Sequence, residues 1–150
     1  MSSRGYDRIL LPTDGTDATA AAIEQAGHIA RLSGATIHIL SVADSRNRFE
    51  SPTAGLAAEA WDDAERDRAE TAVDHAVDAL PDELPTERIV RQGIPHDAVL
   101  DAIDAENIDL VVMGTHGRTG LDHYLIGSVT ERVVRNAPVP VLTVNASASD

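Results

Sequence analysis

The stretch Ile108-Asp109-Leu110-Val111-Val112-Met113 runs directly into a loop that begins at Gly114. A short apolar run of this kind suits a strand that is buried on both faces of a sheet. Arg8-Ile9-Leu10-Leu11-Pro12 shows the same pattern near the start of the chain, and it leads into the polar turn Thr13-Asp14-Gly15. Strands without alternating polarity are typical of parallel sheets that helices cover.

Further segments continue the pattern in both directions from these runs. The expected strands cover 8–12, 35–42, 87–91, 108–113 and 139–144. The expected helices cover 18–32, 59–79, 93–103 and 128–135, where small and apolar residues recur three and four apart. Residues 43–57 show no sustained period and are expected to form a loop, while Pro140 favours an edge position for the last strand. This alternation predicts an α/β fold, a doubly wound five-stranded parallel sheet with helices on both faces.

Composition bounds the size and chemistry of the protein. The 150 residues suit a single domain over 1–150, with a core from about residue 6 to residue 144. All 12 basic residues are arginine, and the chain has no lysine and no cysteine. The missing lysine excludes a P-loop and a Schiff base, and the missing cysteine excludes thiol catalysis, disulfides and cysteine-based metal sites.

The charge balance bears on partners and location. A net charge of −13 disfavours nucleic-acid binding, because phosphate backbones require a basic face. No apolar stretch approaches the roughly 20 residues of a membrane span, so we expect no membrane anchoring and a cytoplasmic location. An acidic, lysine-free chain with 3% aromatic residues is also typical of a halophilic protein, in which salt screens self-repulsion. An ordinary acidic cytosolic protein is the alternative.

Glycines are concentrated between the fourth expected strand and the last helix. Gly114, Gly117, Gly120 and Gly127 precede Ser128, Val129 and Thr130, which open that helix. Backbone N–H groups and hydroxyls at a helix N-terminus form a natural phosphate site. The distribution of charge also favours an anionic ligand here. Residues 114–144 hold two acidic and three basic side chains, whereas residues 43–87 hold thirteen acidic and four basic side chains. The alternative is a flexible loop followed by a basic helix.

The glycine spacing Gly114-x2-Gly117-x9-Gly127-Ser128 is similar to the ATP-binding signature of the universal stress protein family. The chain resembles that family from Tyr6 to Val144. The resemblance includes Pro12-Thr13-Asp14-Gly15, the run Val111 to Arg118 and the closing run Ala137 to Leu142. It implies the ATP-binding branch of the family and a Rossmann-like fold of the adenine nucleotide alpha hydrolase type, with strand order 3-2-1-4-5.

The resemblance also implies a site and its ligand. Adenine and ribose are expected near Pro12, Thr13 and Asp14, with Val42 and Met113 as apolar neighbours of the base. The expected positions of the signature are Gly114, His116, Gly117, Arg118, Gly127, Ser128, Val129 and Thr130, of which those from Gly117 on hold the phosphates. The expected ligand is ATP or another adenine nucleotide, with Mg²⁺ or Mn²⁺ on its phosphates. Asp14 as a simple helix cap, and Val42 and Met113 as plain core residues, are the alternatives.

Three functions remain open from the sequence. The leading hypothesis is an ATP-binding universal stress protein that acts in signalling through its conformation or its partners. A slow ATPase or a nucleotidyl or phosphoryl transferase is the second, although no catalytic residue is evident and no histidine cluster predicts a metal site. The third is a dimeric interaction protein that binds no nucleotide. The apolar edge strand over 139–144 predicts a homodimer, which family members commonly form there.

Overall fold

The structure is a computed structural model that describes residues 5–16, 19–44, 56–115 and 127–145, with the backbone alone over 56–62. Its strands are β1 (Arg8–Pro12), β2 (Thr36–Asp44), β3 (Thr86–Gly93), β4 (Leu110–Gly114) and β5 (Val141–Val144). Its helices are α1 (Ala20–Ser33), α2 (Leu56–Ala79), α3 (Pro95–Ala105) and α4 (Ser128–Asn136). No helix in these described ranges is long and apolar enough to cross a membrane.

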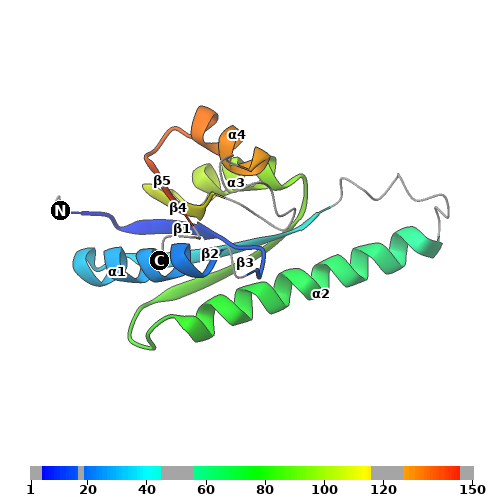
Figure 1. Ribbon diagram of the computed structural model, residues 1–150, viewed down its shortest axis with the longest axis horizontal. Helices are drawn as coiled ribbons and strands as arrows, with labels where there is room; N and C mark the ends of the chain where they lie inside the picture. Colours follow the sequence, from blue (N-terminus) through cyan, green and yellow to red (C-terminus); the bar gives the residue numbers. More distant parts are fainter. Residues whose placement is uncertain (1–4, 17–18, 45–55, 116–126, 146–150) are drawn as a thin grey trace.

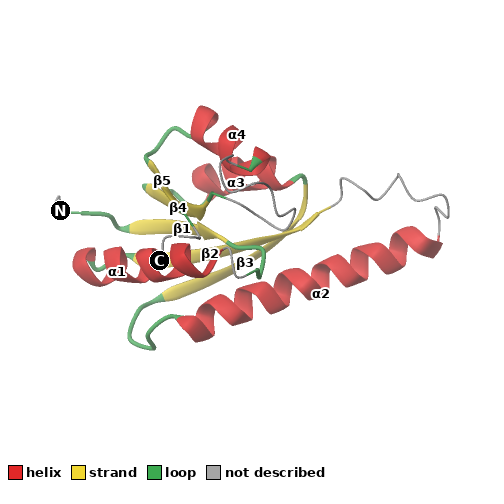
Figure 2. Cartoon of the chain, in the orientation of Figure 1, coloured by secondary structure: helices red, strands yellow, loops and turns green. Residues whose placement is uncertain are grey.

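The five strands form one parallel sheet in the order β3-β2-β1-β4-β5 (Figure 2). This confirms the predicted doubly wound fold and its strand order. The register pairs Ile9 with Ile37 of β2 on one side and with Leu110 of β4 on the other. β1 is therefore the central strand, and the strand order reverses beside it.

Helices cover both faces of the sheet (Figure 1). Successive side chains of a strand point to opposite faces, and both faces of β1 are buried. Ile9 and Leu11 belong to the core cluster under α1 and α2, whereas Leu10 belongs to the cluster under α3 and α4. All three side chains are completely buried, which explains the unbroken apolar run in the sequence.

Several predicted boundaries are wrong, among them both ends of the loop over 43–57 and the start of the last strand. Ala43 and Asp44, expected in a loop over 43–57, extend β2 because they pair with Gln92 and Gly93 of β3. Residues 56 and 57 belong to α2 rather than to that loop, and 45–55 lie outside the described residues. The last strand begins at Val141 and not at residue 139, where Pro138 and Pro140 lack the N–H groups that a ladder requires.

The reversal of strand order sets the place of a ligand site. In open parallel sheets of this type, a crevice forms beyond the carboxyl ends of the two strands at which the order reverses. Here these strands are β1 and β4. The turn after β1 and the start of α4 therefore flank the same crevice.

Candidate functional site

The turn after β1 is fixed by the side chain of Thr13. The N–H of Thr13 donates to the carbonyl of Leu40 at 2.8 Å, one residue beyond the end of β1. The buried hydroxyl of Thr13 accepts from the N–H of Gly15 at 3.3 Å and lies 3.2 Å from the hydroxyl of Thr19. The side chain of Thr13 therefore shapes the turn from within and is directed into the protein.

Asp14 closes the same turn. Its Oδ1 accepts from both the N–H and the hydroxyl of Thr16, at 3.1 and 2.7 Å. The N-cap residue of α1 is Thr19, so Asp14 is a turn residue and not the cap of that helix. Both bonds use Oδ1 of the half-buried carboxylate, and no hydrogen bond to Oδ2 is found among the residues that the structure describes.

The start of α4 is anchored to the end of β4. The hydroxyl of Thr130 donates to the carbonyl of Gly114 at 2.8 Å, and the N–H of Gly127 donates to the carbonyl of Thr115 at 2.6 Å. The first bond of the helix runs from the N–H of Glu131 to the carbonyl of Gly127. The N–H groups of residues 128–130 therefore precede the helical ladder, which is the arrangement that suits an anion.

Two predicted phosphate ligands differ in their surroundings. Ser128 is exposed at the first position of α4. Thr130 is buried, and its hydroxyl donates its hydrogen to the carbonyl of Gly114. Its backbone N–H is therefore the only donor of Thr130 that could bind a phosphate. The sequence places two hydroxyls in the first turn but cannot tell which of them points at β4.

An apolar cluster lies beside these groups. Met113 is buried in the cluster under α3 and α4, and Val42 and Val129 pack against the same cluster. Pro12 is half-buried at the end of β1, where it pairs with Leu40. The structure thus brings together apolar residues from the ends of β2 and β4 and the start of α4. Core packing is one role of this cluster, and it is compatible with contact to a ligand.

Three predicted site residues lie outside the described residues. They are His116, Gly117 and Arg118 in the loop after β4. Within the described ranges, no group of three histidine, cysteine, aspartate or glutamate residues is arranged to hold a metal ion.

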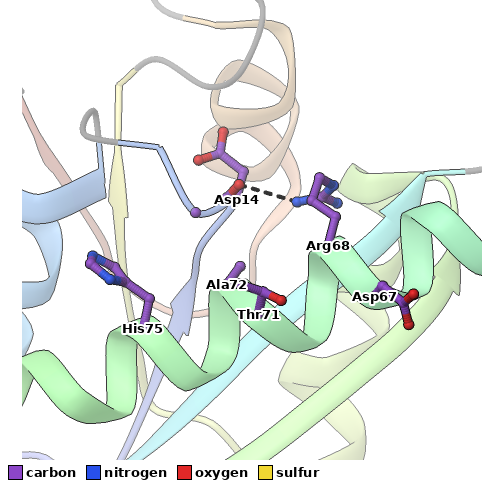
Figure 3. Close-up of a pocket in the computed structure, with 7 residues that line it drawn as sticks. Asp14, Asp67, Arg68, Thr71, Ala72 and His75 are labelled. Atoms are coloured by element: carbon purple, nitrogen blue, oxygen red, sulfur yellow. Dashed lines mark hydrogen bonds between the residues drawn. The ribbon is translucent and has the colours of Figure 1, made fainter.

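A pocket of about 350 Å³ lies between the turn after β1 and α2 (Figure 3). It is lined by Asp14, Gly15, Asp67, Arg68, Thr71, Ala72 and His75. In Figure 3 the carboxyl group of Asp14 points away from α2, while its carbonyl oxygen accepts from Arg68. A Cβ at Gly15 would lie 3.1 Å from that of Ala72, and the φ of Gly15 is +81°, so the close approach of turn and helix favours glycine here.

Sequence reasoning missed the contribution of α2 to this region. Arg68 donates to backbone carbonyls of both β2 and the turn after β1. The available signal was weak, because Arg68 is one of many charged residues on a long helix and charged helix residues usually face solvent.

Comparison with known proteins places these features in a family. The sequence model of the universal stress protein family matches residues 5–145. Universal stress protein MJ0531 of Methanocaldococcus jannaschii is 35% identical over 146 residues, which cover 93% of this chain and 82% of the relative. The solved structure of universal stress protein UspA from Lactobacillus plantarum is similar with a TM-score of 0.80 at 28% identity, covering 95% of this chain and 99% of that chain. A universal stress protein solved in complex with cAMP has a TM-score of 0.62 at 28% identity, with coverage of 95% and 99%.

Proposed function

The chain belongs to the universal stress protein family, and from this membership we propose that it binds ATP in the crevice between the ends of β1 and β4. The observation that carries the proposal is the position of α4. Its N-terminus is bonded to the end of β4, beside the turn that holds Asp14. Helix N–H groups on one side and a carboxylate on the other match the two ends of a nucleotide.

Each end of the nucleotide has a proposed set of partners. Asp14 accepts through Oδ2 from the ribose hydroxyls or the adenine amino group, beside Pro12 and Thr13. Val42 and Met113 form the apolar wall next to the base. The proposed phosphate partners are the N–H groups of residues 128–130, the hydroxyl of Ser128 and the signature residues Gly114, His116, Gly117, Arg118 and Gly127. A divalent cation, Mg²⁺ or Mn²⁺, is proposed to bind through the phosphates.

The comparison with a ligand-bound relative supports an adenine nucleotide. The relative solved with cAMP is 28% identical to this chain and is covered over 99% of its length. Its ligand contains adenine, ribose and phosphate, the same three chemical parts that the crevice is proposed to take. We propose that ATP is the ligand here because the chain carries the complete spacing Gly114-x2-Gly117-x9-Gly127-Ser128.

Binding, and not turnover, is the proposed basis of function. Donors for phosphate are provided by the start of α4, and the protein is proposed to signal the bound state through its conformation or its partners. A phosphate-release assay with the purified protein tests this directly. Release of phosphate well above the uncatalysed background would instead favour the slow ATPase alternative.

The binding itself is tested by titration calorimetry with ATP and magnesium on the native chain and on Gly127→Val. Gly127 has φ −60° and ψ 154°, which valine also adopts, so the added branch acts on the approach of phosphate and leaves the backbone unstrained. We expect micromolar binding by the native chain and a loss of about tenfold or more in the variant. Because Gly127 is buried and the larger valine could disturb the fold, circular dichroism is used to check that the variant is folded.

Gly34→Ala is the matched control. Gly34 ends α1 just before the start of β2, at the amino ends of the strands and so on the side of the sheet opposite to the crevice. Its φ is +75°, and no atom lies within 4 Å of the added Cβ. The substitution is expected to cost about 1 kcal/mol of stability and to leave ATP affinity unchanged. A folded native chain that releases no binding heat, or a Gly127→Val variant with native affinity, would contradict the proposed site.

A further inference from the structure

We propose that Arg68 and Glu65 of α2 are positioning residues for the nucleotide site, which they serve by fixing the backbone at the ends of β1 and β2. This inference rests on the proposed function. Arg68 donates through Nη1 to the carbonyl of Asp14 at 3.1 Å and through Nη2 to the carbonyl of Val42 at 2.7 Å. Glu65 accepts through Oε1 from the N–H of Asp44 at 3.1 Å.

The two side chains also hold each other. Nε of Arg68 lies 3.3 Å from Oε1 of Glu65, one helical turn away. Glu65 thus joins the guanidinium to a third backbone group. Both charges remain compensated, although Glu65 is only 7% exposed.

Arg68 acts where the sheet itself no longer links the two strands. The ladder between β1 and β2 ends with Pro12 opposite Leu40, followed by the bond from the N–H of Thr13. Val42 lies beyond this point and pairs with Arg91 of β3 on its other side. The guanidinium therefore provides the connection between the Asp14 and Val42 carbonyls that the ladder lacks. Its planar fork suits two acceptors at once.

The partly buried Arg68–Glu65 ion pair is better explained by the backbone groups that it bonds than by a gain in stability. Burying a charged pair costs desolvation that its attraction often only offsets, so such a pair is weak evidence for added stability. Arg88 and Asp74 provide a comparison, since they form an ion pair between β3 and α2 in which both side chains are about half exposed. The Arg68–Glu65 pair differs because it bonds backbone atoms of two proposed ligand residues.

The consequence for binding follows from geometry. A shift of the carbonyl of Asp14 or Val42 also moves the carboxylate and the apolar side chain proposed to contact ribose and base. Binding sites require their groups to be held within about 0.5 Å of the productive position. Removing the guanidinium should therefore weaken nucleotide binding, although Arg68 is assigned no contact with the nucleotide.

Calorimetric titration with ATP and magnesium tests this on the native chain, Arg68→Ala, Arg68→Lys and the control Arg88→Ala. We expect the Kd to rise about tenfold or more in Arg68→Ala, with stoichiometry unchanged. Arg68→Lys should fall between it and the native chain, because an ammonium keeps the charge but cannot form the two-pronged contact. Arg88→Ala should bind within about twofold of native.

Thermal midpoints separate positioning from general destabilisation. A variant that melts well above the assay temperature is fully folded, so unfolding does not account for a raised Kd. A native chain without ATP binding would overturn the proposed function itself. A native chain that binds, together with a folded Arg68→Ala of equal affinity, would overturn only the positioning role. If Arg68→Ala does not fold, a folded Arg68→Lys with native affinity overturns it equally.

Discussion

At the scale of single residues, His38 is the most unusual side chain of the sheet. It lies in β2, is 6% exposed, and neither of its ring nitrogens has a hydrogen-bond partner among the described residues. Burial lowers the pKa of His38 below its usual value, against the opposing effects of Glu106 and Glu87, while Arg8 lowers it further. Nδ1 lies 3.7 Å from a carboxylate oxygen of Glu106 at the end of α3. The folded protein therefore favours the neutral imidazole.

This predicts that His38→Leu reduces the loss of stability on acidification. Because the pKa in the folded state is below the unfolded value of about 6.5, the unfolded chain takes up the proton first as pH falls. The native protein should lose stability below that pH, by at most about 1.4 kcal/mol per pH unit for one proton. Urea unfolding of both proteins from pH 8 to pH 5 measures the difference. Identical pH dependence in the two proteins would contradict it.

The proposed site was partly predictable at this scale. Strand ends and glycine spacing point to Asp14, Met113 and the start of α4, because these signals are local in the sequence. The bond from Thr130 to Gly114 and the contacts of Arg68 depend on how helices dock on the sheet. No local pattern encodes which hydroxyl or which arginine reaches a distant carbonyl.

At the scale of elements, the five strands and four helices were predictable because each buried run has a distinct period. The ends of elements were less so. β2 continues through Asp44 because β3 supplies partners for its backbone and Glu65 bonds the N–H of Asp44. Tertiary pairing of this kind overrides the preference of polar residues for loops.

The prediction at the scale of elements concerns β5 as a dimer interface. It is the edge strand beside β4, its Leu142 is 37% exposed, and Val134 of α4 is 47% exposed. We propose that a second copy of the chain covers this edge, so Leu142→Glu should convert a dimer to a monomer. Sedimentation equilibrium in molar KCl measures the mass. Leu32→Glu on α1 is the matched control, since Leu32 is 76% exposed and belongs to neither β5 nor α4. A monomeric native chain, or a dimeric Leu142→Glu, would contradict this interface.

At the scale of the whole molecule, negative charge dominates. The net charge is −13, and α2 exposes acidic side chains from residue 63 on, among them Asp63, Glu70 and Asp78. Like charges on a compact surface repel one another and destabilise the folded state, and salt screens this repulsion. The protein is therefore proposed to be adapted to high salt.

The thermal midpoint should rise when KCl increases from about 0.1 M to about 1 M, as the screening length falls from about 10 Å to about 3 Å. The triple variant Asp63→Asn, Glu70→Gln and Asp78→Asn should show a smaller rise, because it has less repulsion to screen. Differential scanning calorimetry measures both proteins in the two buffers. An equal rise in both would indicate a salt effect unrelated to surface charge.

The central place of β1 also bears on how the chain is made. A ribosome delivers β1, α1, β2, α2, β3 and α3 before it delivers β4. During that interval Ile9 and Leu10 lack their neighbours Leu110 and Val111, and the part of the sheet that α4 later covers stays open to water. The nascent chain thus passes through a stage in which an apolar face of the sheet is exposed and the side of β1 that later pairs with β4 is unpaired. We expect chaperones that act during translation to engage this stage, and to release the chain when β4 arrives.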